Sequence, residues 1–583
     1  MPFLPISRKE MDSLGWDYVD VIIVSGDAYV DHPSFGHAVI ARILESEGLR
    51  VAILPQPNWQ DDLRDFKKLG QPRLFFGVTS GCLDSVVSHY TANKRLRSDD
   101  AYTPGGKAGF RPDRAATVYS KILKQLFPNT PVILGGIEAS LRRTTHYDFM
   151  ESRLMPSILC ESQADLLVYG MGEKPIIEIA KKLQNGQNIH DTKQTAFLTV
   201  GATLRGCPVI NGCPALNLHP HENCLIDSNK FLENTKILEQ NPNAVLTQEI
   251  GDKTLIINPP FPQMQEGEID KSFDLPYERT PHHRYKKRGA LPAYEMIKHS
   301  ITTHRGCFGG CSFCAIHAHQ GKFIASRSEK SILKEVETIT HTPDFKGNIS
   351  DLGGPSANMY KMGGMDENLC FKCKRVSCLY PKICNNLNTN HKVMNELYRK
   401  VLQIKGVKKV FIGSGVRYDM LLHSLNEEND IYIENLILHH TSGRLKLAPE
   451  HTESHILELM RKPDFSVFKK FLLIFQKLCE KHNLKTQIMP YLMSSHPGCK
   501  MSDMKALAKT FRDLNIYPEQ VQDFTPTPST FSTALFYLAL KKNKDAPYVA
   551  TDEMEKREQK ELFFLPQTIR KKSYYPEPSD NSL

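Results

Sequence analysis

The chain has 583 residues, of which 40% are hydrophobic and 24% are charged. This length and composition predict several domains with large cores, and they exclude a wholly disordered chain, a fibrous repeat and a small disulfide-bonded protein. The 74 Lys and Arg residues outnumber the 65 Asp and Glu residues to give a net charge of +9, a mild excess that fits a solvated basic surface and leaves RNA open as a partner.

The first two hundred residues alternate short apolar runs with amphipathic stretches. We expect buried strands that lead into glycine-containing turns at residues 19–24, 51–54, 73–78, 131–136 and 164–173. Amphipathic stretches typical of helices lie between these strands, so strand, glycine turn and helix recur in that order. This alternation predicts a parallel sheet covered on both faces, which is a doubly wound, flavodoxin- or Rossmann-like α/β domain over residues 1–200. Its turns then lie at the carboxyl edge, where such folds take ligands.

Beyond this domain the pattern first weakens and then resumes. Residues 201–290 predict a domain edge and a linker, in which the basic run 284–288 favours a hinge with solvated charges over a phosphate contact. Residues 291–540 again alternate apolar runs with amphipathic helices, including one after a Ser328 cap, and fit a partial (β/α) barrel with a Cys-rich insertion at 365–390. Residues 541–583 predict a helix and a flexible tail.

No apolar run reaches the length of a membrane helix, and the N-terminus has no secretory signal, so we expect a cytoplasmic protein without a membrane partner. Thiols stay reduced in that compartment. Seven of the 14 cysteines fall between residues 307 and 384. Such clustering favours metal ligation over disulfides.

The decisive stretch has the spacing C-x3-C-x2-C and consists of Cys307, Cys311 and Cys314, directly after a strand expected at 296–302. Three thiolates cannot complete a tetrahedral zinc site without a fourth ligand. They can bind three corners of a [4Fe–4S] cube and leave the fourth iron open to a small chelating molecule.

The neighbouring residues fit this interpretation but leave others open. Gly309 and Gly310 let the loop approach a cluster closely, and Phe313 offers an apolar ring for a nucleoside base. The alternatives are a zinc site completed by His304 or His317, and three thiols that bind no metal.

The C-x3-C-x-F-C motif resembles the signature of the radical SAM superfamily. The wider chain, from about residue 15 to 570, resembles the uncharacterised YgiQ-type family of that superfamily. The matching motifs lie at residues 92–94, 99–104, 135–143, 304–316, 319–321, 326–328, 414–417, 448–451, 494–498 and 519–524. The resemblance implies an oxygen-sensitive enzyme in which a [4Fe–4S] cluster binds S-adenosylmethionine and cleaves it to methionine and a 5′-deoxyadenosyl radical. It also implies an electron donor such as flavodoxin or ferredoxin, whereas the substrate stays unknown.

By the same resemblance, two turns are expected to bind S-adenosylmethionine. Gly353 and Gly354 occupy the place of a turn that binds the methionine amino group, although the proline that follows leaves only backbone carbonyls for this contact. Gly413 and Ser414 lie where the ribose and carboxylate approach, and Arg417 is a candidate carboxylate donor. Each could equally be an ordinary turn or a surface arginine, and we assign no catalytic residue.

A second group of four thiols lies within fifteen residues and consists of Cys370, Cys373, Cys378 and Cys384. Four is the number for a closed zinc site or for an auxiliary iron–sulfur cluster, and the spacing does not separate the two. A zinc ion there would support an inserted loop, whereas a cluster would relay electrons or anchor substrate. A reduced loop without metal is the third possibility.

Two weaker signals remain. Residues 31–36 resemble a cobalamin-binding motif, but Asp31 and His32 are adjacent, which breaks the motif and favours a degenerate scaffold or a substrate pocket over cobalamin. Glu450 and His451 follow a barrel strand, where either catalysis or structural support is expected. Two other functions stay open: an RNA-modifying radical SAM enzyme, and a non-catalytic iron–sulfur or zinc protein that binds nucleic acid or a protein.

Overall fold

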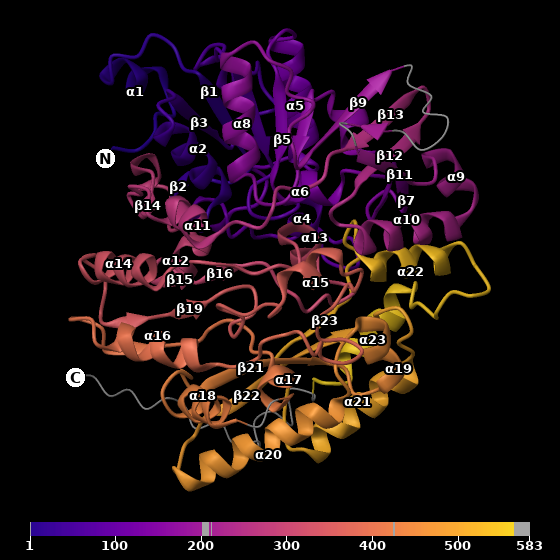
Figure 1. Cartoon of the computed structure of the whole chain (residues 1–583). Coiled ribbons are helices and arrows are strands. Elements are labelled where there is room, and N and C mark those ends of the chain that lie inside the picture. Colours follow the sequence, from indigo (N-terminus) through magenta and orange to yellow (C-terminus); the bar gives the residue numbers. More distant parts are fainter. Residues whose placement is uncertain (1, 201–208, 211–212, 424–425, 565–583) are drawn as a thin grey trace.

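The structure is a computed structural model that describes residues 2–200, 209–210, 213–423 and 426–564 (Figure 1). The N-terminal half forms one layered body, and the C-terminal half forms a second body against it. The contacts between the two bodies position the site described below.

The first body is built on a sheet with ten strands in its described part, ordered β10-β11-β12-β13-β9-β8-β5-β4-β1-β3. Its parallel core consists of β3 (Val51–Pro55), β1 (Val21–Ser25), β4 (Phe75–Thr79), β5 (Val132–Gly135) and β8 (Leu166–Val168). This core confirms the doubly wound prediction, and its order reverses between β1 and β4. The sheet continues through β9 (Thr195–Val200), β13 (Lys253–Ile257), β12 (Val245–Ile250), β11 (Cys213–Asn217) and β10 (Val209–Ile210). Part of residues 201–290, which were expected to be a domain edge and a linker, therefore extends the sheet.

Side chains of β1 alternate between two hydrophobic cores. Val21 and Ile23 belong to one core, on the face covered by α2 (Gly36–Ser46) and α8 (Glu173–Gln184). Ile22 and Val24 belong to the other core, on the face covered by α5 (Ala115–Leu126). Because successive side chains of a strand point to opposite faces, an all-apolar strand requires this double cover.

The second body is a partial barrel of short parallel strands. The pairs are β15 (Ser300–Thr302) with β19 (Asp351–Gly353), β18 (Asn348–Ile349) with β20 (Lys409–Val410), and β21 (Arg444–Glu450) with β22 (Gln487–Ser494), which in turn pairs with β23 (Val521–Asp523). Helices α14 (Glu329–Thr340), α16 (Lys392–Leu402), α17 (Tyr418–His423), α18 (Glu427–Leu438), α19 (Ser454–Met460), α20 (Phe465–Lys481) and α21 (Met501–Asp513) contribute to one continuous core with these strands. The fold class is therefore α/β, with a doubly wound body followed by a partial (β/α) barrel.

Some predictions for single elements were confirmed, and one was partly wrong. Ser328 caps α14 as expected, because its hydroxyl oxygen accepts the backbone N–H of Ser331 at 3.0 Å. The strand expected at 296–302 was wrong in its first half, because Pro292 starts the helix α12 (Pro292–Ile297) there. The helix expected near the C-terminus is confirmed as α23 (Glu553–Glu561), whereas the tail from 565 onwards lies outside the described residues.

The basic run 284–288 is attached to the first body and is not a free hinge. The hydroxyl oxygen of Tyr285 is buried and accepts the backbone N–H of Tyr29 at 3.1 Å. Next to the run, the N–H of Gly105 donates to the carbonyl of Ala290 at 2.8 Å. Lys286, Lys287 and Arg288 are exposed, and Arg284 is half-buried.

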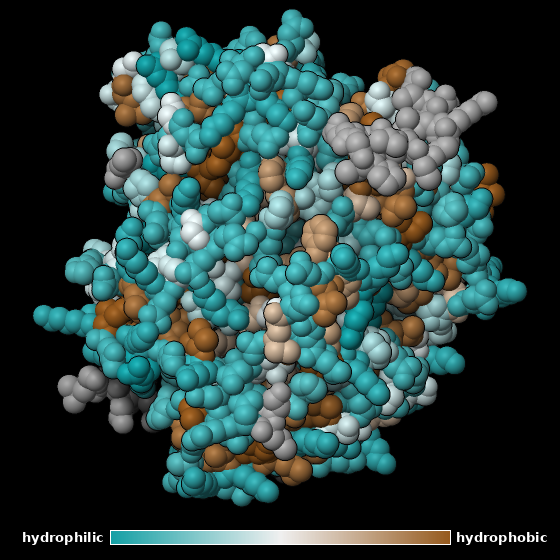
Figure 2. Space-filling model, viewed as in Figure 1, coloured by the Kyte–Doolittle hydropathy of each residue, from teal (hydrophilic) through white to brown (hydrophobic). Residues whose placement is uncertain are grey.

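The carboxyl edge of the first sheet faces the barrel. Helix α6 (Gly136–Leu141), which directly follows β5, packs against α13 (Ala315–Gln320), the helix that follows Cys314. Helix α10 (Ser228–Gln240) packs against α22 (Phe531–Leu540) beside it. The outer surface in this view is mostly hydrophilic (Figure 2). Among the described helices, none is both long and apolar enough to cross a bilayer.

Candidate functional site

The cluster loop, residues 306–314, starts at a glycine that no other residue can replace without strain. Gly306 has φ +91°, and a Cβ built on it would lie 2.0 Å from the carbonyl oxygen of Phe323. Its N–H donates to the side-chain oxygen of Gln320 at 3.0 Å, and the N–H of Cys307 donates to the carbonyl of Gly321 at 3.1 Å. Backbone N–H groups of Gly306 and Cys307 therefore hold the base of the loop against residues 320 and 321.

The three thiols of the loop are half-buried and unfavourable as isolated groups. Burial raises the pKa of Cys314 to about 12, and the charges of Cys311 and Cys307 act in the same direction. Burial also raises the pKa of Cys307. Backbone N–H groups favour the thiolate forms, because Gly309 lowers the pKa of Cys307 and residues 316 and 317 lower that of Cys314. Bound cationic metal would relieve both burial and repulsion.

The spacing of the thiols does not suit a single zinc ion. Tetrahedral ligation at about 2.3 Å would bring the sulfurs to about 3.8 Å from one another. Within the described ranges, only Glu10, His282 and His283 form a trio of ligand atoms all within 4.8 Å, so no three thiols meet this condition. A cubane holds its cysteine sulfurs further apart, because each sulfur binds a different iron. The donor set and its spacing therefore fit a [4Fe–4S] cluster.

Among the described residues, neither histidine that could complete a zinc site forms, with two of the thiols, a group of ligand atoms that all lie within 4.8 Å of one another. His304 is buried, and its Nδ1 lies 2.9 Å from the Thr303 hydroxyl. The Nδ1 atom of His317 lies 3.2 Å from the carbonyl oxygen of Cys307. In the part of the chain that the structure describes, the zinc alternative therefore has no preformed set of ligands.

Arg417, which lies between β20 and α17, reaches the cluster loop. Its Nη1 lies 3.7 Å from Cys311 Sγ, while its Nε and Nη2 donate to the two carboxylate oxygens of Asp419 at 2.9 and 2.5 Å. Burial alone would raise the pKa of Asp419, but the Arg417 charge outweighs it and the pKa is lowered. The bidentate side of the guanidinium is thus occupied by Asp419, which leaves Nη1 facing the sulfur.

The two turns expected to bind S-adenosylmethionine lie side by side. Asp351 accepts the backbone N–H groups of Gly413 at 2.8 Å and Ser414 at 3.2 Å, and it also accepts the Ser414 hydroxyl. The carbonyl of Gly353 accepts both the N–H and the hydroxyl of Thr303, at 2.7 and 3.1 Å. A Cβ on Gly353 would lie 3.3 Å from the Ser414 hydroxyl oxygen, so the turns are in contact.

Other expected residues surround the loop. Gly354 lies against the ring of His304, which a Cβ on Gly354 would meet at 2.5 Å. Phe313 packs edge-on against His496, with ring centroids 6.1 Å apart. Glu450 is buried at the end of β21, with Lys462 Nζ 3.7 Å away, and burial raises its pKa. These placements leave the ligand contacts of Phe313 and Gly354 as predictions.

A cationic group faces the interface between the two bodies. Arg143 donates to the carbonyl of Ser140 at 2.6 Å and stacks on the ring of Tyr169, 5.1 Å from its centroid. Across the interface, the Ser140 hydroxyl lies 2.9 Å from Nδ1 of His319 on α13. Among the described residues, no carboxylate lies within ion-pair distance of Arg143, and its buried Nε has no hydrogen-bond partner. Desolvation consequently lowers its pKa.

Comparison with known proteins assigns the chain to a family. Residues 3–300 match the family model described as Radical SAM N-terminal. A protein of Porphyromonas gingivalis called "UPF0313 protein" is 53% identical over 572 residues, which covers 96% of this chain and 90% of the relative. A "UPF0313 protein" of Bacteroides thetaiotaomicron is 52% identical, covering 100% and 95%. The chain belongs to the UPF0313 family of radical SAM enzymes.

A solved structure also resembles this UPF0313 chain. It is that of the radical S-adenosylmethionine methyltransferase TsrM from Kitasatospora setae, with tryptophan substrate and a SAM analog bound. The identity is 14%, the coverage is 94% of this chain and 83% of that chain, and the TM-score is 0.48.

The second cysteine group of this UPF0313 chain lies beside the first. Helix α15 (Glu367–Lys372) carries Cys370, and the other three cysteines follow in an irregular loop. Burial raises the pKa of Cys378 to about 11, and the charges of Cys384, Cys370 and Cys373 act in the same direction. The structure therefore brings the four thiols together, although the metal identity stays a prediction.

The broken cobalamin motif has structural partners in the UPF0313 chain. Asp31 forms a wholly buried ion pair with Arg42. His32 is also wholly buried: its Nδ1 accepts the N–H of Ser34 at 3.1 Å, and its Nε2 lies 2.9 Å from Arg279 Nη2. The His32 imidazole is therefore not free to ligate cobalt.

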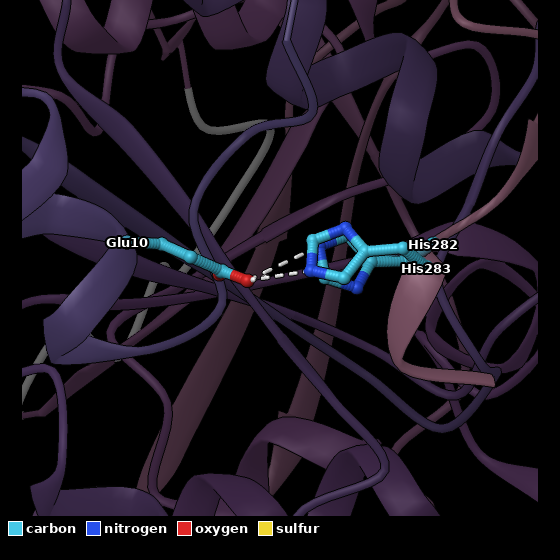
Figure 3. Close-up of side chains that lie close together, drawn as sticks. All are labelled: Glu10, His282 and His283. Atoms are coloured by element: carbon cyan, nitrogen blue, oxygen red, sulfur yellow. Dashed lines mark ion pairs between the residues drawn. The ribbon is translucent and has the colours of Figure 1, made fainter. Parts of the chain in front are cut away.

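The trio that lies within 4.8 Å is shown in Figure 3. Glu10 Oε1 lies 3.4 Å from His282 Nε2 and 3.5 Å from His283 Nε2. The Nδ1 atom of His282 accepts the backbone N–H of Arg284 at 3.3 Å, whereas its buried Nε2 makes no hydrogen bond to a described residue. Glu10, on α1 (Arg8–Ser13), therefore lies within ion-pair distance of both rings without a hydrogen bond to His282, and we assign no metal ion to this trio.

Sequence reasoning missed the acidic residues Asp351 and Asp419, and it missed Arg143, which has no carboxylate partner among the described residues. Asp419 lies two residues after Arg417, a spacing that could have indicated a local ion pair. Asp351 and Arg143 gave no such signal, because their roles depend on contacts between segments distant in sequence.

Proposed function

We propose that this UPF0313 protein cleaves S-adenosylmethionine reductively at a [4Fe–4S] cluster held by Cys307, Cys311 and Cys314, and so starts radical chemistry on an anionic substrate in the cytoplasm. The bound cluster and S-adenosylmethionine supply one electron and a 5′-deoxyadenosyl group, and a one-electron carrier such as flavodoxin or ferredoxin supplies the reductant. The observation that supports this proposal most is that the three sulfurs do not all lie within 4.8 Å of one another and that no described residue joins them in a closed set of zinc ligands.

The chain's own residues would bind and orient the cosubstrate. Since Thr303 occupies the carbonyl of Gly353, the following carbonyls of the turn, at Gly354 and its neighbour, are proposed to receive the amino group. Ser414 and Gly413, held by Asp351, would shape the ribose side. Arg417 would act on the cluster through Cys311 rather than on the cosubstrate carboxylate.

The substrate class follows from Arg143. A desolvated guanidinium without a carboxylate partner is costly unless an anion binds to it. Because Arg143 lies next to Ser140, and Ser140 contacts the helix that follows Cys314, an anion at Arg143 would sit close to the cluster loop. We therefore propose a substrate with a carboxylate or phosphate group. With inorganic phosphate as the probe, R143A should bind the anion roughly tenfold to a hundredfold more weakly than the wild type, whereas R153A, an exposed control, should bind it equally well. Equal binding of phosphate by R143A and the wild type would refute the anion contact and would leave the cleavage of S-adenosylmethionine unaffected.

An RNA substrate is a second candidate. The basic run lines a cavity of about 590 Å³ whose wall includes Trp59, Phe110, Arg284, Lys287 and Arg288. Exposed cations beside aromatic rings are typical of single-stranded nucleic-acid surfaces. Salt-dependent retention of RNA that the double variant K287E/R288E loses would favour this candidate.

The experiment that tests the proposed function is anaerobic incubation of reduced protein with S-adenosylmethionine. We expect the wild type and C479S to form the same amounts of 5′-deoxyadenosine and methionine, because Cys479 belongs to helix α20 and to neither cysteine loop. C311S should form neither, because it removes one cluster ligand. Absence of both products in a wild type that holds its irons would contradict the proposal.

A further inference from the structure

The loop that carries Cys370, Cys373, Cys378 and Cys384 contacts the cluster loop directly, and we propose that its four thiols ligate a second [4Fe–4S] cluster that passes electrons to the first. The electron relay rests on the proposed function, whereas the ligation itself does not.

The chain closes around this loop at both ends. The N–H of Met365 donates to the carbonyl of Asn386 at 2.7 Å, and Gly364 pairs with Leu387. A Cβ on Gly364 would lie 2.1 Å from Cys370 Sγ, so only glycine leaves room for the sulfur. The sulfur of Cys370 therefore lies directly against the closed base of this loop.

Inside the loop, backbone hydrogen bonds join the cysteine residues two by two. The N–H of Cys384 donates to the carbonyl of Cys378 at 2.8 Å, and the N–H of Cys373 donates to that of Cys370 at 3.1 Å. The Asn386 side chain donates to Cys370 Sγ at 3.4 Å. Hydrogen bonds to cysteine sulfur are a usual support for iron–sulfur ligation.

The spacing favours a cluster over one zinc ion. Zinc would hold all four sulfurs about 3.8 Å apart. In the part of the chain that the structure describes, no three of these sulfurs lie within 4.8 Å of one another. A cubane binds one cysteine sulfur at each iron and therefore holds the four sulfurs further apart than a zinc ion does.

A buried ammonium group points to negative charge at this site. Lys322 is 8% exposed, and its Nζ donates to the carbonyls of Cys373 at 3.0 Å and Arg375 at 3.1 Å. No carboxylate of a described residue lies within 4.0 Å of Lys322, so its charge has no acidic partner. The N–H of Arg375 also donates to Cys373 Sγ, at 3.4 Å. A cluster with four thiolates carries net negative charge and would supply the missing counter-charge.

The two loops are in backbone contact. The N–H of Cys378 donates to the carbonyl of Phe308 at 3.0 Å, and the Ser377 hydroxyl donates to the carbonyl of Gly309 at 2.7 Å. Phe308 directly follows Cys307. One hydrogen bond and a short stretch of backbone therefore connect a ligand of the second cluster with a ligand of the first.

The second loop is also accessible to a donor protein. Met365, Leu369 and Phe371 are 71%, 61% and 67% exposed, and basic residues lie among them at 372, 374 and 375. Figure 2 shows apolar patches on the face where Figure 1 places α15. An acidic, low-potential one-electron carrier fits this surface, and each electron that it donates would be accepted at the second cluster and then passed to the first.

The test compares three proteins after anaerobic reconstitution with iron and sulfide. We expect about eight irons and no zinc per wild-type chain, and about four irons in each of two variants. One variant replaces the three thiols of the cluster loop by serine, and the other replaces the four thiols of the second loop. C479S is the matched control and should keep about eight irons. Circular dichroism checks that each variant is folded.

The outcomes separate the claims. About four irons with one zinc in the wild type, or an unchanged iron content in the four-serine variant, would overturn the second cluster. If both clusters are present, the relay predicts that reduction by flavodoxin slows roughly tenfold or more in the four-serine variant, whereas reduction by dithionite does not. Equal rates with flavodoxin would overturn the relay and leave the ligation standing. Failure of S-adenosylmethionine cleavage would affect neither iron count.

Discussion

At the scale of single residues, the site depends on two carboxylates, Asp351 and Asp419, that fix neighbouring groups by hydrogen bonds. Asp351 organises the turn at Gly413 and Ser414, and Asp419 holds the guanidinium of Arg417 so that one of its N–H groups faces a cluster sulfur. Hydrogen bonds and charges beside the sulfurs tune the potential of an iron–sulfur centre. We therefore regard Asp419 as a positioning residue.

The substitution D419N tests this role. It should lower the rate of 5′-deoxyadenosine formation roughly tenfold, about 1.4 kcal/mol of barrier, because the guanidinium loses its anchor. It should also shift the midpoint potential of the cluster while the iron content stays the same. The exposed D430N is the control. A normal rate and potential in D419N would show that Arg417 is held in other ways.

At the scale of elements, local sequence signals predicted much of the scaffold. Apolar runs predicted the parallel strands of the first sheet, because a strand covered on both faces is apolar throughout. The Ser328 cap predicted the start of α14. The expectation at 296–302 failed where Pro292 starts a helix, since apolar residues in a short run fit either structure.

The cluster loop itself yields a prediction at this scale. G306A should hold less than half of the wild-type iron in the first cluster, because the substitution forces Cβ against the Phe323 carbonyl at a positive φ. Iron analysis in the four-serine background, where only the first cluster remains, measures this directly. G267A is the control, since a Cβ there meets open space. Full iron content in G306A would mean that the loop can adjust.

At the scale of the whole molecule, the site is assembled by contacts that sequence could not place. Arg305, beside the cluster loop, pairs with Glu173 of the first body, and Arg461 pairs with Glu239 at 2.8 and 2.9 Å. The partners lie more than a hundred residues apart, and no periodicity links them. The cysteines could be predicted because their spacing is local, whereas the counter-charges depend on this packing. The domain boundaries and the ligand contacts stay predictions.

Buried histidines make the stability of the whole fold depend on pH. Burial lowers the pKa of His37 and of His496 to about 3, against about 6.5 in the unfolded chain. Above pH 6.5 both states hold these rings neutral. As the pH falls towards 3, the unfolded state takes up protons first, so each ring costs about 1.4 kcal/mol of stability per pH unit.

Thermal unfolding between pH 7 and pH 5 checks this dependence. The melting temperature should fall as the pH is lowered, and H37F should make the fall shallower. The exposed His341 provides the control, because H341N should leave the slope unchanged. A melting temperature that is constant over this range would contradict the protonation account.

The central claim is a cluster with one iron open to S-adenosylmethionine at Cys307, Cys311 and Cys314. Electron paramagnetic resonance of the dithionite-reduced protein, recorded with and without S-adenosylmethionine, tests it most directly. The account predicts a reduced [4Fe–4S] signal whose shape changes when S-adenosylmethionine is added and which C311S alters or loses. A reconstituted protein that shows no iron–sulfur signal, or a signal indifferent to S-adenosylmethionine, would contradict it.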